Sequence, residues 1–201
     1  MKKILPIFSY ALHPIFIPFL GCLLYLLFDD VYFSKQQCYL LVFQIIIITF
    51  FLPMTFFYLL RLFGKVDTIM LSDISQRKIP LLLQMALTSI LIKESVTIDR
   101  FPELFFFFLA GLISTIFAFL ALYVKLKASI HMIGLSAITF FVMGLSIHNQ
   151  TNLVYIIAVL FFANGLVASS RLQMKAHTMK ELTAGFLIGS IPQLVLFYCW
   201  L

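Results

Sequence analysis

Apolar runs of membrane-spanning length take up most of this chain of 201 residues. A helix needs about 20 mainly apolar residues to cross the hydrocarbon core of a bilayer. The chain divides almost wholly into such runs, separated by short polar segments. The sequence therefore predicts an all-α fold, a polytopic membrane helix bundle of six to seven transmembrane helices. The seven runs cover residues 4–28, 37–63, 79–98, 102–124, 129–147, 153–169 and 182–201.

The third run is the weakest of the seven. Its uninterrupted apolar part, residues 79–92, is followed by Lys93 and Glu94. At 1.5 Å per residue this part reaches about 21 Å, which is less than a hydrocarbon core of about 30 Å. We expect the helix to run on to Ile98 and cross, with both charged side chains near the interface. A re-entrant segment is the alternative.

Composition excludes a soluble globular protein. The chain is 63% hydrophobic and 11% charged, with a mean hydropathy of +1.09, whereas soluble domains are roughly half apolar and a quarter charged. No polar stretch is long enough for a separate soluble domain, so residues 1–201 are expected to form one integral membrane domain. The first run follows Lys2 and Lys3 as a signal peptide would, but it lacks a small-residue cleavage site and is expected to remain as the first helix.

Partners and cofactors are limited by the same features. The net charge is +6, but the cations lie in short loops without a basic, aromatic-rich surface, which argues against nucleic acid as a partner. Cys22, Cys38 and Cys199 have unrelated spacings, so they predict neither a disulfide framework nor a metal site. The lipid bilayer is the expected partner, and no cofactor signature is present.

The loops divide into two sets on opposite sides of the membrane. Side A holds the N-terminus and residues 61–78, 125–128 and 171–181; side B holds residues 29–36, 93–101 and 148–152 and the C-terminus. Because Lys and Arg favour cytoplasmic loops, an excess on one side predicts orientation. When the candidate catalytic residues Arg77, Lys78, Lys127 and Arg171 are left out, side A still has seven Lys and Arg residues against three on side B. We expect side A to face the cytoplasm and the protein to be a multi-pass protein of the cell's inner membrane. Side A carries Lys2, Lys3, Arg61, Lys65, Arg77, Lys78, Lys125, Lys127, Arg171, Lys175 and Lys180, and side B carries Lys35, Lys93 and Arg100.

Two features inside the runs predict details of the bundle. Pro14 and Pro18 should kink the first helix near His13, which either lines a pocket or is held by a backbone carbonyl. Gly185 and Gly189 form a Gly-xxx-Gly pair that permits close contact with a neighbouring helix.

The polar stretch from Ser170 to Glu181 is the strongest indication of chemistry. His177 and Glu181 are four residues apart, so on a helix they share a face, and the carboxylate can bind one ring nitrogen and leave the other as base or nucleophile. Arg171 offers a planar fork suited to phosphate oxygens. A bend between Arg171 and His177 would let them converge. An ordinary basic loop between two membrane helices is the alternative.

The same stretch resembles a known signature. Ser170-Arg171, five residues, His177, three residues and Glu181 are similar to the third motif of the type 2 phosphatidic acid phosphatase and haloperoxidase superfamily, Ser-Arg-x5-His-x3-Asp. Glu181 stands in the Asp position and is one methylene longer. The resemblance extends in shape and motif order to compact bacterial members of the superfamily.

Two weaker stretches fit the same resemblance. Ser129 and His131 resemble the second motif, Pro-Ser-Gly-His, although Ala128 and Ile130 replace Pro and Gly. The basic pair Arg77-Lys78 before Pro80 stands in the place of the first motif, Lys-x6-Arg-Pro, with a poorer match; a snorkelling basic cluster is the alternative. Two runs separate Lys78 from His131 and two separate His131 from Arg171, so the three stretches meet on one side only if the third run crosses.

The resemblance implies a membrane lipid phosphatase of phospholipid metabolism, which hydrolyses a lipid phosphomonoester or diphosphate through a phosphohistidine. The substrate would be of the phosphatidate, phosphatidylglycerophosphate or prenyl diphosphate class. His177 would be the nucleophile, Glu181 would steady its ring, and His131 would protonate the leaving oxygen and activate water. No metal is expected, since the side A loops hold only Asp67, Asp73 and Glu181 as carboxylates. The residues implied to bind phosphate are Arg171, Arg77, Lys78, Lys127, Ser129 and Ser170.

Two other functions remain open from the sequence. A catalytically inactive superfamily member could act as a lipid-binding or scaffold protein of the membrane. A small transporter or channel would need ionisable residues near mid-membrane, and the runs contain very few. The sequence leaves the oligomeric state open.

Overall fold

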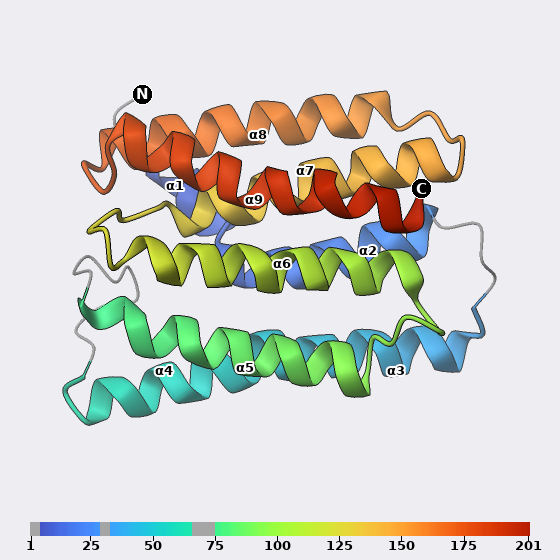
Figure 1. Cartoon of the computed structure of the whole chain (residues 1–201), viewed down its shortest axis with the longest axis horizontal. Coiled ribbons are helices and arrows are strands. Elements are labelled where there is room, and N and C mark those ends of the chain that lie inside the picture. The colour runs from blue at the N-terminus through green and yellow to red at the C-terminus, as the bar shows by residue number, and fades with distance from the viewer. Residues whose placement is uncertain (1–4, 29–32, 66–74) are drawn as a thin grey trace.

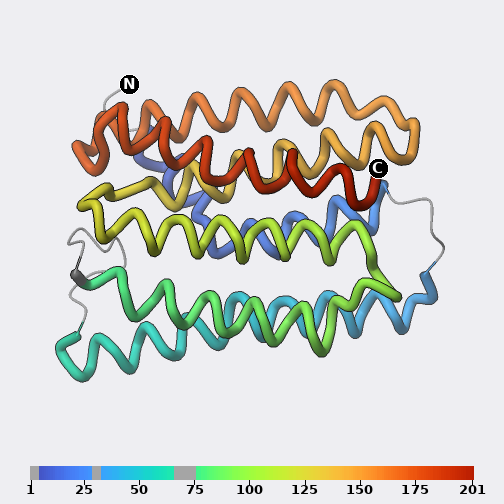
Figure 2. The backbone as a smooth tube through the Cα atoms, in the orientation of Figure 1, coloured from blue at the N-terminus to red at the C-terminus, as the bar shows by residue number. Residues whose placement is uncertain are grey.

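The computed structural model describes residues 5–28, 33–65 and 75–201, and every regular element in these ranges is helical. The elements lie side by side as one bundle (Figures 1 and 2). They are α1 (Leu5–Ala11), η1 (Pro14–Phe16), α2 (Ile17–Phe28), α3 (Lys35–Ile46), η2 (Ile47–Phe51), α4 (Leu52–Leu62), η3 (Ser75–Arg77), α5 (Lys78–Glu94), α6 (Pro102–Ala121), α7 (Ile130–His148), α8 (Val154–Gln173) and α9 (Met179–Trp200).

The prediction of an all-α membrane bundle is confirmed. Six helical segments of the described chain are long and apolar enough to cross a membrane: Leu5–Phe28, Lys35–Leu62, α6, α7, α8 and α9. Helix α5 is a seventh, shorter segment of 17 residues. It runs antiparallel to α6 from one end of the bundle toward the other (Figure 1).

Helix α5 crosses the bundle but ends earlier than predicted. The expected continuation to Ile98 is wrong, because α5 stops at Glu94 and Ser95 caps it. Its 17 residues span about 26 Å. Lys93 and Glu94 form an ion pair at 3.7 Å, with side chains 82% and 64% exposed. Charged residues at the last turn therefore end the segment at the edge of the bundle.

The first span is broken where the prolines predict. Helix α1 ends at Ala11, and η1 begins at Pro14 with His13 as its cap. The His13 Nδ1 accepts a hydrogen bond from the Ile15 N–H at 3.3 Å. Because the regular helix stops here, the carbonyl of Ser9 is available to a residue of another helix.

Helix α7 lies at the centre of the bundle and packs against α9 most extensively. Close approach depends on the Gly-xxx-Gly pair of α9, as predicted. A Cβ on Gly185 would lie 2.6 Å from the Ser129 carbonyl oxygen, and one on Gly189 would collide with the Ile133 carbonyl. The Ser129 N–H donates to the Glu181 carbonyl at 3.1 Å. These contacts tie the side A ends of α7 and α9 together.

The second span changes its geometry halfway. A π-helical turn, η2, links α3 to α4, and Pro53 follows it within α4. No residue of α4 is buried. The face of α4 that turns inward still lines a cavity, with Pro53, Met54, Phe57 and Leu60.

Candidate active site

A cavity of about 290 Å³ opens at the side A end of the bundle. Its polar lining includes Arg77, Arg171, His131, His177 and His13. These residues come from η3, α7, the end of α8, the α8–α9 connection and the break in the first span. The rest of the lining is mainly apolar, from η1, α2, α4, α5, α6 and α7. Because α5 crosses the bundle, all three sequence stretches reach the same cavity.

The predicted bend lies between Arg171 and His177. Helix α8 ends at Gln173, and Lys175 has a left-handed backbone with φ of 52°. The Ala176 N–H returns to the Arg171 carbonyl at 3.1 Å. Such a bonding pattern satisfies the last carbonyls of a helix and reverses the chain. Both Arg171 and His177 consequently line the cavity.

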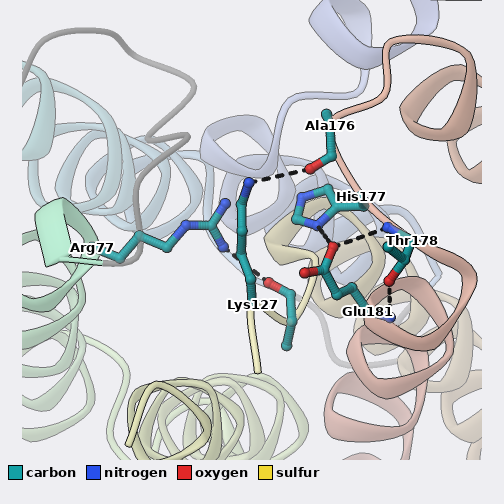
Figure 3. A network of polar contacts seen from close by, with 7 residues as sticks. Arg77, Lys127, Ala176, His177, Thr178 and Glu181 are labelled. Carbon is teal, nitrogen blue, oxygen red and sulfur yellow. Dashed lines mark hydrogen bonds and ion pairs between the residues drawn. The ribbon is translucent and has the colours of Figure 1, made fainter. Parts of the chain in front are cut away.

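Glu181 fixes the orientation of the His177 ring (Figure 3). Thr178 caps α9, and Glu181 occupies the third position of the helix in a capping box. One oxygen, Oε2, accepts from the Thr178 N–H at 2.9 Å and lies 3.1 Å from His177 Nδ1. The proton of a neutral ring is therefore held on Nδ1, which leaves the lone pair on Nε2. The geometry of the longer acid thus fulfils the orienting role expected of Asp.

His177 is a neutral base at neutral pH. Burial and, after it, the positive charges of Arg77 and Arg171 lower its pKa to about 4, although the hydrogen bond to Glu181 acts in the opposite direction. The His177 side chain is only 1% exposed. An unprotonated nitrogen buried beside two cations is suited to attack an anionic electrophile.

His131 lies in the first turn of α7, and its ring is anchored by the broken first span. Its Nε2 lies 3.0 Å from the Ser9 carbonyl oxygen, which can only accept. The proton of the neutral ring is therefore on Nε2, and Nδ1 is the nitrogen that can exchange a proton. The His13 ring meets His131 edge-on, with centroids 5.2 Å apart. His13 is thus a cavity residue, the first of the two roles considered for it.

Two arginines supply buried positive charge to the cavity. Arg77 is 3% exposed and Arg171 is 2% exposed. The Arg77 Nη1 donates to the Ala128 carbonyl at 3.1 Å (Figure 3). The pKa of Arg77 is lowered to about 10, mainly by burial; the charge of Glu181 acts against this fall and that of Arg171 adds to it. Arg77 therefore stays charged at neutral pH.

The remaining residues implied to bind phosphate are not among those that line the cavity. Lys78 is exposed, and its Nζ lies 5.4 Å from the centre of the Tyr123 ring. Lys127 is half-buried beside the site, where its Nζ donates to the Ala176 carbonyl at 3.2 Å (Figure 3). These contacts place Lys127 next to His177 and turn Lys78 away from it.

Neither serine of the two motifs lines the cavity. Ser170 Oγ lies 2.6 Å from Ser9 Oγ, which ties α8 to α1. Ser129 is fully buried, and in the described part of the chain its Oγ has no hydrogen-bond partner. The structure therefore brings together His177, Glu181, His131, Arg77 and Arg171.

One contributor to the site was not predicted from the sequence. The Ser9 carbonyl that holds His131 is a backbone group of another span. Asp67 and Asp73 lie outside the described residues. Within residues 5–28, 33–65 and 75–201, no three His, Cys, Asp or Glu side chains are grouped so that they could hold a metal ion.

No family model matches the chain, and no curated protein or solved structure matches it either. Function is therefore inferred from the residues of the site and their geometry.

Proposed function

We propose that the protein is a membrane lipid phosphatase that acts through a phosphohistidine on His177. The observation that carries the proposal is the junction of two environments in one cavity. Its side A end combines a neutral histidine, oriented by Glu181, with two buried arginines. The rest of the cavity is mainly apolar. A lipid phosphate has the same division between an anionic head and a hydrocarbon tail.

The polar end is suited to phosphoryl transfer. This reaction depends mainly on positioning and on cations around the equatorial oxygens of phosphorus. Arg77, Arg171 and His177 line the same cavity, so a phosphate near His177 Nε2 would meet the positive charge of both guanidinium groups. Planar guanidinium groups bind phosphate oxygens in pairs.

Two transfers make up the proposed cycle. In the first, His131 Nδ1 accepts the proton of a phosphate monoanion, the His177 Nε2 lone pair attacks phosphorus, the bond from phosphorus to the lipid oxygen breaks, and that oxygen takes the proton from His131 Nδ1. Glu181 stabilises the positive charge that develops on the His177 ring. In the second, His131 Nδ1 takes a proton from water, the water oxygen attacks phosphorus, and the N–P bond breaks. His131 Nδ1 returns this proton to the inorganic phosphate, which leaves, and His177 regains its lone pair.

The apolar part of the cavity favours a lipid substrate over a soluble phosphate ester. It is lined by Pro53 and Phe57 of α4, Leu81 of α5, Phe108 of α6 and Ile133 of α7, among others. Hydrocarbon buried against such side chains contributes about 0.8 kcal/mol per methylene. Substrates of the phosphatidate, phosphatidylglycerophosphate or prenyl diphosphate class would fit this description. From the distribution of Lys and Arg, the site would open at the cytoplasmic face of the inner membrane.

A lipid-binding protein without turnover is the second candidate. It is favoured by the positions of Lys78, Ser129 and Ser170, which leave fewer groups at the cavity to hold a phosphate than the resemblance implies. Such a protein would bind lipid phosphates through Arg77 and Arg171 and release none of the phosphate.

The test is a phosphate-release assay on purified, detergent-solubilised protein in the presence of a chelator. Phosphatidate, phosphatidylglycerophosphate, a prenyl diphosphate and lipid A phosphate would be compared, with His177→Ala as the matched variant. Release from at least one lipid, lost in His177→Ala, is the expected result. Equal rates for the two proteins would overturn the proposal. Binding of a lipid phosphate without release would favour the second candidate.

A further inference from the structure

A second polar group lies deeper in the same cavity. Gln84 and Thr88 of α5 both line it. They are seven and eleven residues beyond Arg77, so the three share one face of the helix. Counted from Lys78 at the start of α5, their positions lie about 9 and 15 Å along the axis. The cavity thus has polar side chains at two depths, at its side A end and in its apolar interior.

The Thr88 hydroxyl differs from the other threonine hydroxyls of the cavity. Thr49 and Thr115 each donate to the carbonyl four residues earlier in their own helix, both at 2.8 Å. Thr88 instead pairs with the Gln84 amide, with 3.3 Å between Nε2 and Oγ1. Thr88 is almost fully buried.

Among the described residues, two hydrogen-bond donors of this pair have no acceptor. If the amide nitrogen of Gln84 donates to Thr88, one amide N–H and the Thr88 O–H remain. If the amide is turned the other way, Thr88 donates to it and both amide N–H groups remain. In an apolar cavity within a membrane, a hydrogen-bond donor without an acceptor is unfavourable. A polar pair there therefore favours a ligand that brings an acceptor.

We propose that Gln84 and Thr88 form a second subsite, which donates hydrogen bonds to an ester carbonyl of an acylated glycerol phosphate. The subsite rests on the proposed function, because the phosphate of the same ligand occupies the end with Arg77 and His177. An ester carbonyl lies a few bonds from phosphorus in such a lipid. The Gln84 side chain leans toward the start of α5, which brings its amide nearer to the phosphate. A prenyl phosphate has no acceptor at this position, so the subsite selects glycerolipids.

The test compares two lipids that differ only in this acceptor. Dissociation constants of a diacyl glycerol phosphate and its dialkyl ether analogue, with equal chain lengths, would be measured on the purified His177→Ala protein in detergent. The ratio of kcat/KM for the two lipids would be measured on the parent. The expected preference for the ester is about 10-fold, as one or two hydrogen bonds to a neutral acceptor provide. A prenyl phosphate should bind less tightly than the ester.

Substitutions then assign the preference to the pair. Gln84→Met and Thr88→Val should each reduce it toward unity, and Thr88→Ser should keep it. Thr115→Val is the matched control, because that hydroxyl is already bonded within α6, and its preference should equal the parent's. Melting temperatures would show that each variant is folded.

The outcomes separate the subsite from the catalytic proposal. Equal affinity for ester and ether, or a preference that survives both Gln84→Met and Thr88→Val, would overturn the subsite. So would binding of neither lipid, or tighter binding of the prenyl phosphate. A preference in binding, with no phosphate released by the parent, would support the subsite while the catalytic proposal fails.

Discussion

Two histidine–carboxylate pairs lie toward opposite ends of the bundle. At side A, His177 Nδ1 is 3.1 Å from Glu181. At side B, His148 Nε2 is 3.4 Å from Glu103, whose other oxygen accepts from the Tyr25 hydroxyl at 3.2 Å. The two pairs contain the same chemical groups, but their surroundings differ.

The surroundings decide what each pair can do. His177 lines the cavity with both buried arginines of the described chain, Arg77 and Arg171. His148 does not line that cavity, and its ring packs against Trp200 with centroids 5.7 Å apart. Glu103 links α2, α6 and α7 through its two partners. A histidine–carboxylate pair thus joins helices at side B, while at side A cations and a cavity give it the surroundings of a catalytic site.

The largest difference is expected between the two histidines. His177→Ala should lower phosphate release from a lipid phosphate by about 10³-fold or more, because it removes the nucleophile. His148→Ala should leave the rate unchanged. Steady-state kinetics on both purified variants would measure this, and a comparable loss in His148→Ala would remove the distinction between the pairs.

The second largest difference is expected between substitutions of the two carboxylates, Glu181 and Glu103. Glu181→Gln should lower kcat by about 10- to 100-fold, because the His177 ring loses the charged partner that orients it. Glu103→Gln should keep the rate and lower the melting temperature, because a buried link between helices is weakened. A fall in melting temperature without loss of rate in Glu181→Gln would reassign that residue to structure.

The cavity itself should show a smaller effect. A side chain on Gly111 would project into open space, since nothing lies within 4 Å of its Cβ position. Gly111→Leu should fill the cavity and raise KM for a long-chain lipid phosphate about 15-fold, the change expected for displacing about two buried methylenes, with less effect on a short-chain one. Gly165, on an exposed face of α8, also has open space around its Cβ position, so Gly165→Leu is the matched control. Equal KM values for the two variants would mean that the hydrocarbon tail of the lipid does not bind in this cavity.

Protonation of His177 should have the smallest effect near neutral pH. The ring must be neutral to attack, and its pKa is about 4. Above about pH 4 the His177 Nε2 keeps its lone pair. Protonation of His177 should therefore not reduce kcat/KM between pH 7 and about 5.5, and should lower it only as the pH approaches 4. If the pKa of His177 were that of an ordinary histidine, activity would already fall below about pH 6.5. A pH profile of kcat/KM would measure this. A loss of activity centred near pH 6.5 that persists in all the other variants would contradict the role of burial.

The sequence predicted much of the fold because apolar runs and prolines act locally. The helices, the break at Pro14 and the close contact at Gly185 each follow from a few adjacent residues. The end of α5 was predicted too late, since the charged residues Lys93 and Glu94 end the segment and are exposed at its edge.

The site was less predictable because neighbouring side chains on a helix diverge. Arg77 and Lys78 are adjacent, but successive residues turn by about 100° around a helix. Arg77 is therefore buried in the cavity, while Lys78 lies exposed over Tyr123. The anchoring of His131 by Ser9 joins residues 122 positions apart, and local spacing contains no sign of it.

The most direct measurement is to trap the intermediate. Purified protein would be mixed with a lipid phosphate labelled in its terminal phosphate, quenched at alkaline pH to preserve phosphohistidine, digested and sequenced by mass spectrometry. The phosphate should be found on His177, should be absent from His177→Ala, and should still be found on His177 in His148→Ala. Steady turnover with the phosphate on another residue, or with no phosphorylated protein at all, would contradict the account.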